Sequence, residues 1–384
     1  MAARVPGVRV ISGWLAVCGV WLCTSSAQAQ GVPDPRSVAA ATALSVDVST
    51  VQRCRDALEA VYRRDYTSAR AQLDTLTVEL PTSGLGPLGM ALLYQALMFE
   101  NFDYQYERPY ELARDQTRAQ VEKGLEDPAN DALDYFVLAG IEGVDAMHAA
   151  RKREYLSALA RALDATRALS KSRDLAPDFV DADLGDGLYY FWRTVISEQS
   201  KALPRFKDRQ DEGIALMKHA ELEAAFVGPG ASLALAYAYM EDHDLKSALA
   251  RCLAARVRYP NNVINELTIG RIYTQMGRTT DALTTFTGVL VIAPSNQRVH
   301  YLQGIALLRG QRYAEAAAEF NAYLAFPDVP IEYRGETWYR IGQVAYRQKD
   351  YPTARTAYEK AVEESGDAYA KRALQKMRKQ GLGE

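Results

Sequence analysis

Apolar residues recur at helical spacing along most of this chain. The segments 89–102 and 132–147 both place apolar residues three and four positions apart, as on one face of an amphipathic helix. No segment alternates apolar and polar residues for long enough to predict a β-strand. Turn-forming residues separate the helical segments, so we expect helical hairpins and an almost wholly helical chain after residue 50.

A spaced pattern of small and large residues occurs four times in the C-terminal half. A small residue is followed twelve positions later by an alanine, and a larger residue comes four positions after this alanine. Successive copies are 34, 34 and 38 residues apart, and a proline-bearing loop occupies the longer interval. The four copies are Ala236, Ala248 and Cys252; Gly270, Ala282 and Phe286; Gly304, Ala316 and Phe320; and Gly342, Ala354 and Tyr358.

Each marked position has a role in helix packing, most clearly in the second copy. The small residues Gly270 and Ala282 allow two helix backbones to approach closely, and Phe286 fills the space beside them. Gly277 is expected in the turn, where glycine adopts a positive φ without steric cost. Pro294 follows the second helix and ends it, because proline lacks the backbone N–H that the helix requires.

This pattern resembles the tetratricopeptide repeat family over about residues 229–366. The resemblance implies an all-α solenoid of helix–turn–helix units wound into a right-handed superhelix, which binds partners and performs no catalysis. We interpret residues 50–225 as degenerate hairpins of the same kind, since Ala69 and Leu73 show the second-helix spacing and Ala158 and Ala162 also follow it. Residues 367–384 are expected to form a polar capping helix and tail.

The first 29 residues have the three parts of a secretory signal peptide. Arg4 and Arg9 precede a short apolar stretch, and the small-x-small sequence Ala27-Gln28-Ala29 predicts cleavage before Gln30. A lipoprotein is the alternative, because the sequence Leu-Ala-Val-Cys, which ends at Cys18, is similar to a lipoprotein cleavage site. Val17 stands, however, where such a site has a small residue. We therefore expect an exported, bacterial-type protein in the periplasm or outside the cell, with a flexible segment over 30–49.

Charge and composition exclude several classes of function. Removal of Arg4 and Arg9 with the signal changes the net charge from −3 to −5, so nucleic-acid binding is not expected. No later segment has an apolar run of membrane-spanning length. The two remaining cysteines, Cys54 and Cys252, are expected to be far apart, and Cys252 is interpreted as a buried apolar residue.

Neither a catalytic site nor a site for a cofactor or metal is predicted. The four histidines are scattered and interpreted as exposed helix residues, and the acidic run from Asp178 to Asp186 lacks the spacing of a calcium loop. Pro177 and these carboxylates are interpreted as the start of a helix. The aromatic residues around Trp192 are interpreted as core, with a contact surface for a partner as the alternative.

Binding is expected in the groove that the first helices of successive repeats line in this family. The expected groove residues, assigned by register, are Tyr237, Leu267, Arg271, Tyr301, Arg309, Tyr339, Gln343 and Arg347. Tyrosine and arginine commonly anchor protein interfaces. The sequence therefore predicts a non-enzymatic scaffold for a protein or peptide, and the alternative is a helical carrier of a small molecule or glycan.

Overall fold

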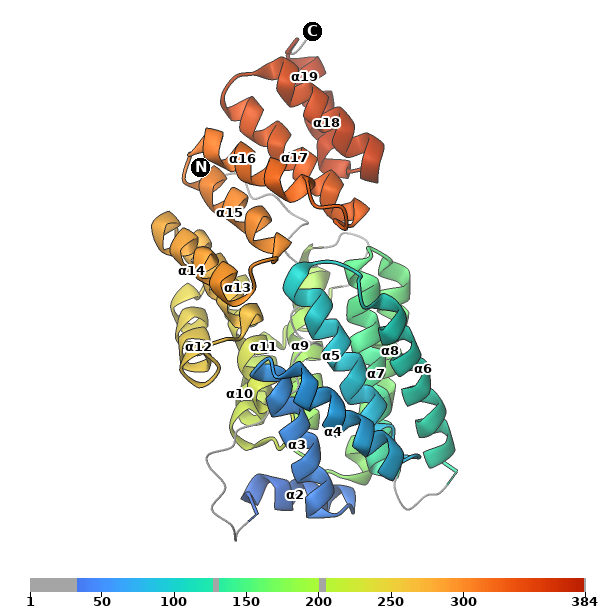
Figure 1. Ribbon diagram of the computed structural model, residues 1–384. Coiled ribbons are helices and arrows are strands. Elements are labelled where there is room, and N and C mark those ends of the chain that lie inside the picture. Colours follow the sequence, from blue (N-terminus) through green and yellow to red (C-terminus); the bar gives the residue numbers. More distant parts are fainter. Residues whose placement is uncertain (1–32, 127–130, 200–204, 383–384) are drawn as a thin grey trace. The chain divides into compact units, whose positions relative to one another are not determined.

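The chain is helical throughout the part that the structure describes. The computed structural model describes residues 33–126, 131–199 and 205–382 (Figure 1). These residues form 18 α-helices and no β-strand, which confirms the all-α fold class. None of the helices in these three ranges is both long and apolar enough to span a bilayer. The signal peptide expected over residues 1–29 lies outside the described residues.

The helices divide into two compact units. The first unit contains the described residues up to Leu97 together with Tyr106–Asn262, and the second contains Met98–Gln105 and the described residues from Val263 onward. The first unit contains α2 (Pro35–Leu44), α3 (Val48–Tyr62), α4 (Tyr66–Glu79), most of α5 (Leu85–Asn101), α6 (Glu107–Gly124), α7 (Asp131–Arg151), α8 (Tyr155–Leu175), α9 (Ala182–Gln199), α10 (Gln210–Glu223), α11 (Gly228–Glu241) and α12 (Leu245–Arg258). The second unit contains α13 (Val263–Gln275), α14 (Thr279–Ile292), α15 (Gln297–Arg309), α16 (Tyr313–Leu324), α17 (Ile331–Arg347), α18 (Tyr351–Ser365) and α19 (Ala368–Lys379).

Consecutive helices pack as hairpins, and each hairpin packs against the next. In the second unit α13 pairs with α14, α15 with α16 and α17 with α18. The second helix of one hairpin also contacts the first helix of the next, and the first helices α13, α15 and α17 contact one another in order. In the first unit the same pairing joins α3 to α4, α7 to α8, α9 to α10 and α11 to α12.

Six hairpins share one turn geometry, which reveals a common repeat in both units. In each hairpin, the residue five positions before the alanine has a positive φ, between 60° and 75°. The six pairs of turn residue and alanine are Arg64 and Ala69, Arg153 and Ala158, His243 and Ala248, Gly277 and Ala282, Gln311 and Ala316, and Lys349 and Ala354. The hairpins α3–α4 and α7–α8 therefore have the register of the C-terminal repeats, as the spacing predicts.

The residue after this turn directly precedes the second helix and often caps it. The carboxylates of Asp65 and Asp244 accept the backbone N–H groups of Ser68 and Ser247, each at 3.1 Å. Asp350 caps α18 in the same way, since its carboxylate accepts the backbone N–H of Thr353 at 3.2 Å. A capping carboxylate satisfies an N–H group that has no partner within the helix, so these aspartates fix where each second helix starts.

Three features differ from the sequence-based expectations. Residues expected to be flexible over 30–49 include helix α2, where the Asp34 carboxylate accepts the N–H of Arg36 at 2.9 Å and the helix buries Ala41 and Leu44. Pro177 does not start a helix, because α9 begins only at Ala182 and the intervening residues form turns. The first of the four repeats, α11 and α12, lies in the first unit, whereas the other three lie in the second.

Candidate functional site

The expected groove residues lie on the first helices of four hairpins. Tyr237 lies on α11 in the first unit and is only 3% exposed. The other seven residues lie in the second unit. Leu267 on α13 is 1% exposed and belongs to the core around Phe286, so its side chain is enclosed by the protein itself. Arg271 on the same helix is half-buried.

Tyr301 and Tyr339 are joined by a polar network across α15 and α17. The Tyr301 hydroxyl donates to the Glu336 carboxylate at 2.7 Å, and Arg340 donates to the same carboxylate at 3.1 Å. Arg340 also donates to the side-chain oxygen of Gln343 at 3.1 Å, and the Gln343 amide donates to the Tyr339 hydroxyl at 2.9 Å. The structure thus brings three of the predicted residues together.

Glu336 and Arg340 hold this network together, and sequence reasoning missed both. Burial raises the pKa of Tyr301 well above its ordinary value, and the neighbouring Glu336 carboxylate adds to the rise, so the hydroxyl remains a donor. Arg340 remains charged beside this carboxylate. On α17, Glu336 lies three positions before Tyr339, and Arg340 lies three positions before Gln343. Residues three apart lie on the same side of a helix, and this spacing is the only signal in the sequence that could have indicated Glu336 and Arg340.

The predicted arginines of the last two repeats are the accessible members of the set. Arg309 is exposed at the end of α15, and Arg347 is exposed at the end of α17. Tyr301 and Tyr339 are half-buried. The ring of Tyr339 packs against the rings of Tyr358 and Tyr369, at centroid distances of 5.7 and 5.9 Å. The helices α15 and α17 therefore each carry a partly exposed aromatic ring and, eight positions further on, an exposed positive charge.

A segment from elsewhere in the chain packs against the start of α15. The Arg298 guanidinium donates to the backbone oxygen of Phe99 at 2.6 Å and lies 3.4 Å from the centroid of the Phe102 ring. The Asn296 side chain donates to the backbone oxygen of Glu100 at 3.0 Å. Residues Met98–Gln105 are therefore an integral part of the second unit.

The same segment reaches the start of α17. The ring of Phe102 stacks on Tyr333 with centroids 5.0 Å apart, and the Tyr104 hydroxyl donates to Glu332. Phe102 has a φ of 57°, a left-handed conformation that is unfavourable for an aromatic residue and is held by these contacts. The repeats thus already bind one aromatic segment of their own chain at the beginnings of α15 and α17.

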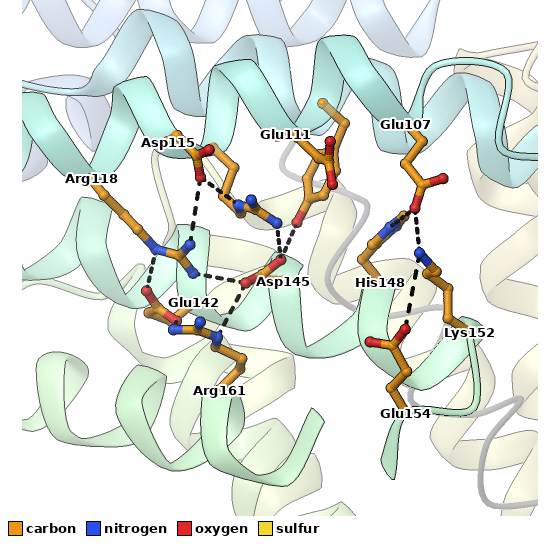
Figure 2. Close-up of polar contacts among 12 residues, drawn as sticks. Glu107, Glu111, Asp115, Arg118, Glu142, Asp145, His148, Lys152, Glu154 and Arg161 are labelled. Atoms are coloured by element: carbon orange, nitrogen blue, oxygen red, sulfur yellow. Dashed lines mark hydrogen bonds and ion pairs between the residues drawn. The ribbon is translucent and has the colours of Figure 1, made fainter. Parts of the chain in front are cut away.

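A second polar network crosses α6, α7 and α8 in the first unit. Figure 2 shows the buried carboxylates Glu142 and Asp145 of α7 surrounded by arginines. Arg118 of α6 pairs with both carboxylates at 2.7 Å, and Arg161 of α8 pairs with them at 3.2 and 3.3 Å. Arg114 pairs with Asp145 at 3.3 Å. Each buried charge has opposite charges beside it, so the network joins three helices.

The pKa of Asp145 shows that this network stabilises the ionised carboxylate. Burial raises the pKa of Asp145, but hydrogen bonding to Arg118 and the charges of Arg114 and Arg118 outweigh burial and lower it below the ordinary value. Tyr110 donates a further hydrogen bond to the same carboxylate at 2.9 Å. The arrangement is structural, since its charges are used in contacts between helices.

His148 is buried on α7 next to this network, contrary to the expectation of exposed histidines. One ring nitrogen lies 2.9 Å from the Gln95 amide, and the other lies 3.3 Å from Glu107, which also pairs with Lys152 at 2.6 Å (Figure 2). Burial and, next, the positive charge of Arg151 lower the pKa of His148 to about 4, so the ring is neutral at neutral pH. Of the other histidines, His219 and His243 are exposed.

The acidic run at the start of α9 makes contacts within the protein. The buried Asp181 carboxylate accepts the backbone N–H groups of Ala225, Phe226 and Val227 at 2.9, 2.6 and 2.9 Å. Asp183 pairs with Arg173 at 2.7 Å, and a ring nitrogen of His219 lies 2.6 Å from the same carboxylate. The described residues contain no cluster of side chains that could hold a metal ion.

The aromatic residues around Trp192 divide between core and surface. Phe191 and Trp192 are 0% and 1% exposed, so they belong to the core of the first unit. Tyr190 is half-buried and lies beneath the guanidinium of Arg209, which is 3.3 Å from the centroid of its ring. The side chains of Cys54 and Cys252 are both buried.

The succession of helical hairpins defines an α-helical repeat protein. Residues 267–330 and 335–368 match family models described as tetratricopeptide repeat, so the C-terminal part of this chain contains tetratricopeptide repeats. These two ranges comprise most of α13 to α18 and contain seven of the eight expected groove residues, all except Tyr237. No curated protein matches the chain.

Two solved structures illustrate the similarity of fold. The APC/C hetero-tetramer Cut9-Hcn1 is similar over 86% of this chain and 62% of that chain, with 14% identity and a TM-score of 0.49. This chain therefore spans less than two thirds of that relative. The human IFIT1 dimer with PPP-AAAA is similar over 97% of this chain and 92% of that chain, with 14% identity and a TM-score of 0.48. At these values neither similarity bears on what this protein binds.

Proposed function

We propose that this protein is a non-enzymatic scaffold that binds a protein or peptide partner through the first helices of its last two repeats. The observation that supports it best is the linked set Tyr301, Gln343 and Tyr339, which lies within tetratricopeptide repeats and beside the exposed Arg309 and Arg347. Repeat solenoids commonly use such surfaces for binding.

The chemistry of this face favours a partner with apolar and acidic groups. Tyrosine rings supply contact area at low entropic cost, and arginines form two-pronged hydrogen bonds with carboxylates. The face is supported from beneath, because Glu336 and Arg340 fix the side chains of Tyr301 and Gln343. A preorganised surface loses little conformational entropy when a partner binds.

A charge reversal at the two exposed arginines tests the proposal. The double variant Arg309→Glu and Arg347→Glu is compared with wild type in affinity capture followed by mass spectrometry. The matched control reverses two exposed charges of α19, Lys371→Glu and Arg372→Glu. We expect a protein that wild type and control both capture to be lost from the first variant, while circular dichroism shows equal helix content. Equal capture by all three proteins would place the binding surface elsewhere.

We further propose that the protein works outside the cytoplasm, in the periplasm of a bacterium or beyond. The support is the basic, apolar and small-residue sequence of residues 1–29, which lies outside the described residues. N-terminal sequencing of the protein from the envelope fraction should give Gln30 as the first residue. An intact Met1 or a lipid on Cys18 would contradict cleavage at this site.

A further inference from the structure

The six hairpins of common register carry side chains of very different size at the fourth residue after the hairpin alanine. We call this the plug position, because its side chain fills the space between the two helices of one hairpin and the first helix of the next. Three hairpins place an aromatic ring there, and α7–α8 places only a methyl group. The plug residues in chain order are Leu73, Ala162, Cys252, Phe286, Phe320 and Tyr358.

A cavity lies where the ring is missing. It has a volume of about 130 Å³, lies among α7, α8 and α9, and is lined by Ala162 and by Ala146 opposite it. Next to Leu73, which is larger than alanine but smaller than phenylalanine, the cavity is only about 30 Å³. Of these two cavities, the larger therefore lies beside the smaller plug residue.

The walls of the larger cavity are apolar. Phe136, Val144 and Leu184 form buried parts of the lining. Three polar groups of the lining already have partners. The Thr166 hydroxyl donates to the Ala162 backbone oxygen at 2.8 Å, Asp181 accepts three backbone N–H groups, and Asp186 pairs with Arg173 at 2.9 Å. A mainly apolar site whose carboxylates are already paired favours an uncharged ligand, because a charged ligand would lose its hydration without compensation.

The cavity is accessible from the side of α8. Ala162, Thr166 and Tyr189 are half-buried, so the lining reaches the surface at these residues. Leu159 and Leu163 of the same helix are 52% and 41% exposed. Leu159 lies three residues before Ala162 and seven before Thr166, on the same side of the helix, so apolar surface continues from the cavity outward.

We propose that this cavity binds a small uncharged aromatic molecule with one ring or two fused rings. The fold itself shows what fits at this position, since Phe286, Phe320 and Tyr358 each place a ring there in other hairpins. Apolar cavities of about 150 Å³ bind benzene or xenon. This site is separate from the first-helix face of the last two repeats, and its ligand is independent of the partner proposed for that face.

Indole is a suitable probe, and two variants of α8 give a matched pair. Ala162→Phe supplies the missing ring from the protein, whereas Ala160→Phe adds the same ring at an exposed position of the same helix. We expect indole to raise the thermal midpoint of wild type and of Ala160→Phe and to give saturation-transfer NMR signals with both. Ala162→Phe should raise the midpoint without ligand and abolish the response to indole.

Several results would overturn the proposal. One is that indole changes neither the thermal midpoint nor the NMR signals of wild type. Another is that the Ala162→Phe variant still responds to indole as wild type does. If Ala162→Phe does not fold, xenon-pressurised crystals of wild type decide the question. Xenon between Ala146 and Ala162 supports the site, and crystals without xenon there overturn it. None of these measurements depends on capture of a protein partner, so each proposal can fail alone.

Discussion

The ring of Phe286 lies directly against Gly270, and a Cβ atom on Gly270 would be 2.3 Å from the Cε1 atom of this ring. The same relationship joins Gly304 to Phe320 and Gly342 to Tyr358, where the nearest ring atom would be 2.5 Å away. The first copy of the pattern has Ala236 instead of glycine and, with it, the smaller Cys252. Each hairpin thus matches a small residue on its first helix to the side chain opposite.

We predict that Gly270→Ala destabilises the protein by about 1–3 kcal/mol, because the added methyl group must displace a ring that is 0% exposed. Gly288→Ala is the control within the same hairpin. Its Cβ atom would have no neighbour within 4 Å, so the higher helix propensity of alanine should stabilise the protein by about 0.5–1 kcal/mol. Urea denaturation measures both changes, and effects of the same sign would contradict this packing.

The repeat turns give a second pair of substitutions with opposite effects. Gly277 and Lys349 occupy the same turn position, with φ values of 75° and 64°, and both are exposed. Gly277→Ala should destabilise the protein by about 1 kcal/mol, because a residue with Cβ is strained at positive φ. Lys349→Gly should remove this strain and be neutral or slightly stabilising. Thermal denaturation compares the two, and a larger loss for Lys349→Gly would be the contrary result.

The sequence predicted those parts of the fold that depend on short spacings. The hairpins of the second unit follow from intervals of twelve and four residues, because one small residue, one alanine and one ring lie within a single hairpin. The groove residues Tyr301, Tyr339 and Gln343 also follow from register, although their role in binding stays a prediction.

Contacts between distant parts of the sequence were not predictable in this way. The segment around Phe99 meets Arg298 across 199 positions, and nothing in the local pattern of either residue indicates the other. Asp181 stands directly before α9, as the sequence indicates for a helix start, but the pattern does not show that its carboxylate accepts backbone N–H groups 44 to 46 positions later. The burial of His148 likewise depends on Gln95 of α5 and Glu107 of α6.

The network of α6, α7 and α8 should be sensitive to loss of a single arginine. Arg118→Ala removes one of the arginines that pair with Glu142 and Asp145, which are only 5% and 7% exposed, and leaves buried negative charge with less compensation. We expect a destabilisation of about 3–5 kcal/mol. Arg167→Ala on α8 is the control, since its ion pair is exposed and should contribute less than about 1 kcal/mol. Similar losses in chemical denaturation would show that the network is not buried in solution.

His148 should make the protein less stable in mild acid. Its pKa is lowered from 6.5 to about 4 in the folded protein, so between these values the unfolded chain binds a proton that the folded chain does not. Stability from this group is therefore complete above about pH 6.5 and decreases as the pH falls toward 4. From pH 7 to pH 5 the decrease should reach about 2 kcal/mol.

The variant His148→Gln separates this contribution from that of the carboxylates. Glutamine does not titrate, so the free energy of unfolding should fall less between pH 7 and pH 5 in the variant than in wild type. Asp181 is present in both proteins, and its pKa, raised by burial to about 6, acts in the opposite direction: its contribution increases as the pH falls. Equal pH dependence of the two proteins in urea denaturation would mean that His148 titrates alike in the folded and unfolded chains.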